Sequence, residues 1–146
     1  MFLKNPLAII KTLPKDLDFI ICGPTAAKIL GLTSVTSKVF VYTEKPYNLD
    51  KEVIAIVTDS LSDIACTGNT LKRTTPEKTI SDILEMKSTF KFDIQIPIET
   101  LANYMIDCQE GRRCISELES FLQANGTYES YLELKDRAEE WVDYGA

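Results

Sequence analysis

The stretch TTPEKTISDIL, residues 74–84, is where the pattern of this sequence turns from strand-like to helical. Thr74 can be the N-cap of the new helix, with Glu77 closing a capping box. Alternatively, Thr75 can be the N-cap, with Pro76 in the first helical position. Either start predicts a helix that clamps the preceding hairpin to a following helical region.

The helix predicted here is amphipathic. Its apolar face carries Ile80, Ile83 and Leu84, at the spacing of one side of a helix. Lys78 and Asp82 lie four residues apart, which predicts a helix-surface ion pair worth a few tenths of a kcal/mol. The largely polar opposite side consists of Glu77, Lys78, Ser81, Asp82 and Glu85. We therefore expect a surface helix with one buried face.

Residues 19–31 show a strand followed by a short helix. The run FIIC at residues 19–22 is apolar and of strand length. Gly23 and Pro24 suit the start of a helix, and Gly31 suits its end.

Two further strands and a hairpin are predicted before residue 74. The segments KVFVYT, residues 38–43, and EVIAIVT, residues 52–58, are rich in β-branched and aromatic residues. The dipeptide Gly-Asn at residues 68–69 lies between residues 66–67 and 70–71. This two-residue connection favours a primed hairpin turn.

Residues 90–96 alternate apolar and polar side chains with a period of two. Such alternation predicts a strand, which Pro97 ends. The apolar side of this strand consists of Phe90, Phe92, Ile94 and Ile96.

From Pro97 onward the pattern is helical. The first helix carries Ile98, Leu101, Ala102 and Met105 on one side, and the second carries Leu118, Phe121 and Leu122 and stops at Asn125-Gly126. The third helix runs from Tyr128 to about Tyr144. We predict an α+β fold, in which a mixed α/β lobe with a small sheet, residues 1–95, is followed by a three-helix lobe, residues 96–146, packed on it.

The third helix carries the clearest charge pattern. Residues 115–146 hold eight acidic side chains against Lys135 and Arg137, a net charge of −6 that equals the formal charge of the whole chain. At about 100° per residue, the apolar cluster is Tyr131, Leu134, Ala138, Trp141 and Val142, and the row opposite is Glu129, Glu133, Asp136 and Glu140.

This row of four acids, the acidic ridge, has two interpretations. A charged helix face is most often a solvated face. It can also be a docking surface for a basic protein, because complementary charge speeds encounter and selects partners. Tyr128 and Leu132, beside the ridge, are the expected apolar anchors. The predicted partner-binding residues are Tyr128, Glu129, Leu132, Glu133, Asp136 and Glu140.

The sequence contains no histidine, which narrows the possible chemistry. Ser-His-Asp and Cys-His nucleophile pairs, HExxH metalloproteases and zinc deaminases are all excluded. Enzymes that use paired carboxylates, a lysine or a carboxylate-bound metal stay open, but no spacing singles out such a group. We predict a protein that is not an enzyme, with no catalytic residues, no metal and no cofactor.

Cysteine usage and hydropathy indicate the compartment. Cys22, Cys66, Cys108 and Cys114 form no close CxxC pair, so free thiols are expected. No apolar run has the length needed to span a bilayer, and the N-terminal residues show no signal-peptide pattern. We expect a cytoplasmic protein without a membrane partner.

Nucleic-acid binding has little support in the sequence. Lys72, Arg73 and Lys78 form a small basic group, whereas DNA-binding footprints are broader and belong to domains with a basic balance. Direct DNA binding is not expected unless another subunit supplies it.

Three segments in order resemble a known family. FIICGPTAAKILGL, then the strands KVFVY and EVIAIV, then KRTTPEKTISDIL are similar to the C-terminal domain of AbiEi-type antitoxins. These are the antitoxin half of type IV toxin-antitoxin and phage abortive-infection systems. The similarity spans roughly residues 19–84, and the family motif at the capped helix corresponds to Glu77, Lys78, Thr79 and Asp82. Lys78 stands where the family has an arginine, which keeps the charge but loses the planar fork.

The resemblance implies a function. Such antitoxins usually carry an N-terminal winged helix-turn-helix that binds their own promoter, and we expect this chain to lack it, since few residues precede Phe19. The implied role is to counteract a cognate nucleotidyltransferase-type toxin, by contact or indirectly. The alternative is an acidic inhibitor or decoy from a mobile element that binds a nucleic-acid-handling host protein.

Overall fold

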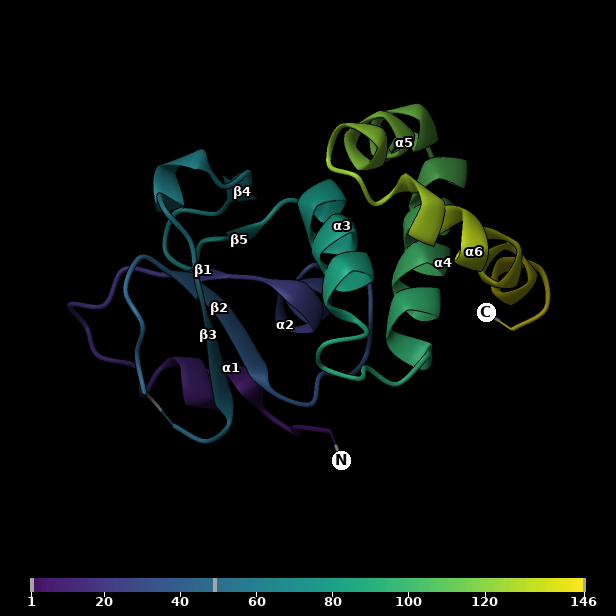
Figure 1. The fold of residues 1–146 in the computed structure, drawn as a ribbon. Coiled ribbons are helices and arrows are strands. Elements are labelled where there is room, and N and C mark those ends of the chain that lie inside the picture. The colour runs from purple at the N-terminus through teal and green to yellow at the C-terminus, as the bar shows by residue number, and fades with distance from the viewer. Residues whose placement is uncertain (1, 49, 146) are drawn as a thin grey trace.

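A five-stranded mixed sheet and six α-helices make up the α+β fold of residues 2–48 and 50–145, the part of the chain that this computed structural model describes (Figure 1). The predicted fold class is confirmed. The strands are β1 (Ile20–Ile21), β2 (Val39–Thr43), β3 (Val53–Val57), β4 (Cys66–Thr67) and β5 (Arg73–Thr74), in the spatial order β3-β2-β1-β5-β4.

Strands β2 and β3 confirm the strands predicted at residues 38–43 and 52–58, and they pair in parallel. β1 runs antiparallel to β2 and parallel to β5. Between β2 and β3 the described residues, 44–48 and 50–52, contain no crossover helix. The sheet is therefore mixed, with β3 at one edge and β4 at the other.

The hairpin of β4 and β5 has a longer connection than the sequence predicted. Cys66 pairs with Thr74 and Thr67 with Arg73, so residues 68–72 form the loop and the two-residue turn is wrong. β5 lies between two strands, because Arg73 pairs with Ile21 of β1 on one side and with Thr67 of β4 on the other. The Ile21 N–H also donates to the Lys72 carbonyl at 2.8 Å, which attaches the end of the loop to β1.

The helices are α1 (Pro6–Ile10), α2 (Gly23–Ile29), α3 (Pro76–Met86), α4 (Gln95–Gln109), α5 (Ile115–Ala124) and α6 (Tyr128–Glu140), which continues as a π-helical turn over Trp141–Gly145. Helix α2 begins at the predicted Gly23, and α5 ends directly before the predicted stop at Asn125. Figure 1 shows α3 standing between the sheet and the group α4, α5 and α6.

Helix α3 starts in the second of the two predicted ways. Thr75 is the N-cap, its Oγ1 accepts from the Lys78 N–H at 3.3 Å, and Pro76 follows. Thr74 instead hydrogen-bonds to Thr79, with 2.6 Å between the two hydroxyl oxygens. A capping box from Thr74 to Glu77 is therefore not formed.

The predicted polar side of α3 is partly wrong. Ile80 and Ile83 are buried as expected, but Ser81 and Asp82 are buried too. Helix α3 packs against α2 on one side and against α4, α5 and α6 on others, so it is an internal helix with few exposed positions. The buried hydroxyl of Ser81 forms a hydrogen bond with the hydroxyl of Thr127, with 2.9 Å between the two oxygens.

The strand predicted at residues 90–96 is wrong. Residues 87–91 form turns, and α4 begins at Gln95. Phe90 and Phe92 both pack edge-on against Phe40 of β2, at 5.3 and 5.5 Å between ring centroids. The alternating apolar residues thus anchor a turn to the sheet. Pro97 fits the first turn of α4, where its missing N–H costs nothing.

The main core joins the two predicted lobes. The buried residues predicted for the helices at Ile98, Leu101, Ala102, Met105, Leu118 and Leu122 all lie in it. Ala27 of α2, Leu32 shortly after α2, and Ile80 and Ile83 of α3 belong to the same core. The division into residues 1–95 and 96–146 stays a prediction, and hydrophobic packing runs across it.

Candidate partner-binding surface

Helix α6 places the acidic ridge on the outside of the molecule. Tyr131, Leu134 and Ala138 are buried against α4 and α5, as the period of the helix predicts. The opposite side of the helix is exposed along its whole length and carries Glu129, Glu133, Asp136 and Glu140.

The charge of the ridge is not neutralised locally. Within residues 2–48 and 50–145, none of its four carboxylates lies in a salt bridge. Lys135, the nearest lysine in sequence, is drawn away, because its Nζ lies 3.7 Å from Glu119 and 5.9 Å from the Tyr131 ring centroid. The ridge therefore presents four carboxylates without a salt bridge to solvent, with the exposed Arg137 beside Asp136.

The two expected apolar anchors, Leu132 and Tyr128, differ in their exposure to solvent. Leu132 is 42% exposed and stands beside the ridge as predicted. Tyr128 is half-buried, and its ring packs against Tyr131 with centroids 5.7 Å apart. Leu132 is free for a partner, whereas Tyr128 is largely occupied by the core.

An apolar hollow at the far end of the ridge was missed by sequence reasoning. It has a volume of about 660 Å³ and lies where the end of α6 meets the start of α4. Ile94 and Tyr144, which are 46% and 89% exposed, line it next to Glu140. The wrong strand at residues 90–96 hid this site, because it placed Ile94 in a sheet.

The four family-motif residues have internal roles. Glu77 accepts a hydrogen bond from the Tyr104 hydroxyl at 2.7 Å. Thr79 is buried against Thr74, and Lys78 pairs with Asp82. None of the four is exposed, so the motif stabilises the packing of α3 and is not part of the ridge surface.

The Lys78–Asp82 pair lies next to Tyr42 of β2, and Lys78 Nζ is 5.5 Å from the centroid of the Tyr42 ring. Burial raises the pKa of Asp82, and Lys78 opposes that rise. Burial and the nearby Asp82 raise the pKa of the Tyr42 hydroxyl. Burial also raises the pKa of the Cys22 thiol, so it stays protonated and is a poor nucleophile.

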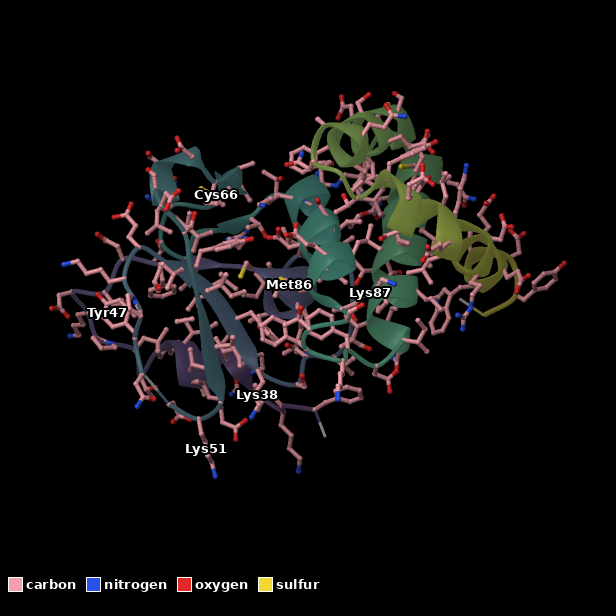
Figure 2. The ribbon with its side chains drawn as sticks, viewed as in Figure 1. Lys38, Tyr47, Lys51, Cys66, Met86 and Lys87 are labelled. Atoms are coloured by element: carbon pink, nitrogen blue, oxygen red, sulfur yellow. The ribbon has the colours of Figure 1, made fainter. Side chains whose placement is uncertain are left out.

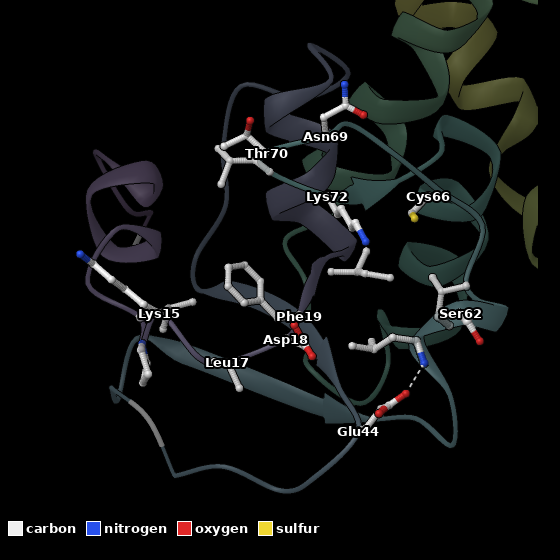
Figure 3. Close-up of a pocket in the computed structure, with 16 residues that line it drawn as sticks. Lys15, Leu17, Asp18, Phe19, Glu44, Ser62, Cys66, Asn69, Thr70 and Lys72 are labelled. Atoms are coloured by element: carbon white, nitrogen blue, oxygen red, sulfur yellow. Dashed lines mark hydrogen bonds between the residues drawn. The ribbon is translucent and has the colours of Figure 1, made fainter.

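A second hollow, of about 830 Å³, opens beside the start of β1 and the hairpin (Figure 3). Asp18, Glu44 and Lys72 line it, and no two of these groups form a salt bridge in the described part of the chain. The Glu44 carboxylate already has a hydrogen-bond partner, since its Oε2 accepts from the Leu61 N–H at 2.9 Å. Figure 3 shows Lys15 pointing away from the hollow.

In residues 2–48 and 50–145, no group of three or more Cys, Asp or Glu side chains could hold a metal ion. The same residues contain no helix that combines the length and the hydropathy needed to cross a membrane. The four cysteines are free. Comparisons with models of known protein families, with curated proteins and with solved structures found no match.

Proposed function

We propose that this chain is a non-enzymatic, antitoxin-like protein of a bacterial or phage defence system. It counteracts a nucleotidyltransferase-type toxin by binding it, and it acts in the cytoplasm. The acidic ridge of α6 is the binding surface, and the partner face is basic.

One observation carries the proposal: four exposed carboxylates with no salt bridge in the described residues lie on one helix beside two apolar contact points. Leu132 is one contact point and the hollow beside Glu140 is the other. Binding energy in protein interfaces comes chiefly from such apolar anchors, while charge sets encounter rate and specificity. The sequence resemblance to AbiEi-type antitoxins supplies the class of partner.

The second candidate function uses the same surface. A row of carboxylates carries the sign of charge of a nucleic-acid backbone, and this favours a mobile-element inhibitor or decoy that binds a nucleic-acid-handling host protein. The partner distinguishes the two functions, because the decoy predicts a host nuclease or polymerase.

Co-expression with the toxin encoded beside this chain tests the proposal. We expect the wild-type chain to relieve growth arrest. A variant with Glu129→Gln, Glu133→Gln, Asp136→Asn and Glu140→Gln should relieve it much less. The matched control changes four exposed acids elsewhere to amides, at Asp16, Asp18, Asp63 and Glu85. Persistent arrest with the wild-type chain would remove the antitoxin function.

A further inference from the structure

The outer edge of β3 is an unprotected sheet edge. Among the described residues, β2 is the only strand that pairs with β3. The five residues of β3, VIAIV, include no charge and no proline, the features that normally protect an edge from pairing. Val57 is 52% exposed at its end.

The backbone groups on this edge can be assigned residue by residue. The Val39 N–H donates to the Glu52 carbonyl, and the Thr58 N–H donates to the Thr43 carbonyl. Even-numbered residues of this segment therefore direct their backbone groups at β2. Ala55 and Val57 direct theirs outward, because groups alternate along a strand.

We propose that two copies of this chain form a symmetric dimer by antiparallel pairing of β3 with β3. The sheet then continues through the interface. This interaction is separate from the acidic ridge and does not depend on the proposed function. Pairing closes at two copies, because the other edge of β3 is already bonded to β2.

The sequence of β3 is suited to pairing with itself. VIAIV reads the same in both directions about Ala55, so a two-fold axis there sets Val53 opposite Val57 of the second copy. Ile54 then faces Ile56 of the second copy on the other side of the sheet. Cross-strand pairs of β-branched residues stabilise a sheet.

Charges at the two ends of β3 favour one register of pairing. With the axis at Ala55, Lys51, in the turn before β3 of one copy, lies at the same end of the paired strands as Asp59, just after β3 of the other copy, twice in the dimer. A shift of the register by one step moves these two charges apart by two residues along the strands. Lys51 and Asp59 are exposed and in no salt bridge within the described chain, and Figure 2 shows Lys51 projecting from the end of the sheet.

The hydrogen bonds of the dimer follow from the same geometry. Ala55 N–H and C=O exchange bonds with Ala55 of the second copy. Val57 N–H donates to the Val53 carbonyl of the second copy. The Val53 N–H does not contribute, because it already donates to the Asp50 carbonyl at 2.9 Å.

Sedimentation equilibrium over a concentration series tests the proposal, with twice the 16.4 kDa chain mass as the expected species. Ala55→Pro removes an outward N–H that β2 does not use, so it should give a folded monomer. Ala55→Gly keeps the N–H and is the control that should still dimerise. A wild-type chain that stays monomeric at every concentration overturns the proposal.

Charge exchange tests the register and does not depend on how well the proline variant folds. Lys51→Asp and Asp59→Lys should each raise the dimer Kd on the order of tenfold, since each brings like charges to the same end of the paired strands, twice in the dimer. The double variant restores opposite charges and should recover the wild-type Kd. A dimer that neither single variant weakens uses another surface and contradicts the proposal.

Discussion

Lys78 Nζ lies 2.9 Å from Asp82 Oδ1 inside the fold, where Asp82 is only 2% exposed. The i,i+4 spacing was visible in the sequence, but the burial was not. A buried pair differs from a surface pair, because the loss of one partner leaves the other charge without compensation. The second oxygen, Asp82 Oδ2, has no hydrogen-bond partner in the described structure, so Lys78 is the main compensation.

Removal of Lys78 should therefore destabilise the protein. We expect Lys78→Ala to lower the free energy of unfolding by roughly 2–4 kcal/mol, measured by urea denaturation. The control Lys38→Ala breaks the exposed Lys38–Glu52 contact at 3.8 Å and should cost less than about 1 kcal/mol. The double variant Lys78→Met with Asp82→Leu should recover most of the loss. If Lys78→Ala and Lys38→Ala lowered the free energy of unfolding by equally small amounts, the buried pair would not be a stabilising contact.

The ionisation of Glu99 makes the free energy of unfolding depend on pH in the acid range. Burial favours a higher pKa, but hydrogen bonds from Thr33, Ser34 and Gln95 outweigh it and lower the pKa of Glu99 below its usual 4.5. A carboxylate with a lowered folded pKa contributes stability that is complete above its unfolded pKa and is lost as the pH falls through the folded value.

The measurement is urea denaturation of the wild type and of Glu99→Gln between neutral pH and acid. The wild type should be the more stable at neutral pH, and its advantage should shrink below about pH 4.5. Asp16→Asn provides a control for general acid effects, since Asp16 is exposed and its side chain forms no hydrogen bond or salt bridge in the described structure. An advantage that is constant with pH would contradict the role of Glu99.

The N-cap of α3 gives a third prediction. Thr75→Ala removes the hydroxyl that accepts from the Lys78 N–H and should cost about 1 kcal/mol of unfolding free energy. Thr75→Ser keeps an oxygen at this position and should retain most of the stability. Equal losses from both variants in thermal denaturation would mean that the methyl group matters and the cap does not.

The sequence predicted local elements well where one pattern dominates. β2, α2, α5 and α6 follow from residue type and period, because each has one buried side or lies largely inside, and β3 follows from its β-branched residues. The strand predicted at residues 90–96 is wrong, because Phe90 and Phe92 contact Phe40 from a segment that is not a strand. Alternation alone cannot distinguish a strand from a turn whose side chains fold back on a sheet.

The surroundings of α3 and the hollow near Glu140 depend on tertiary packing. An amphipathic pattern says which side of α3 is apolar, but not that α2 covers the opposite side. The exposure of the ridge was predictable, since α6 has a single buried face. The hollow depends on where α4 begins relative to Trp141, which no local pattern encodes.

The central claim is that α6 binds a basic toxin through charge, and the most direct measurement is the association rate of the purified adjacent toxin with this chain at two salt concentrations. We predict that the four-amide ridge variant lowers the association rate on the order of tenfold at low salt and that added salt removes most of the difference. The control with amides at Asp16, Asp18, Asp63 and Glu85 should bind like the wild type. Identical rates for the wild type, the ridge variant and the control would contradict the claim.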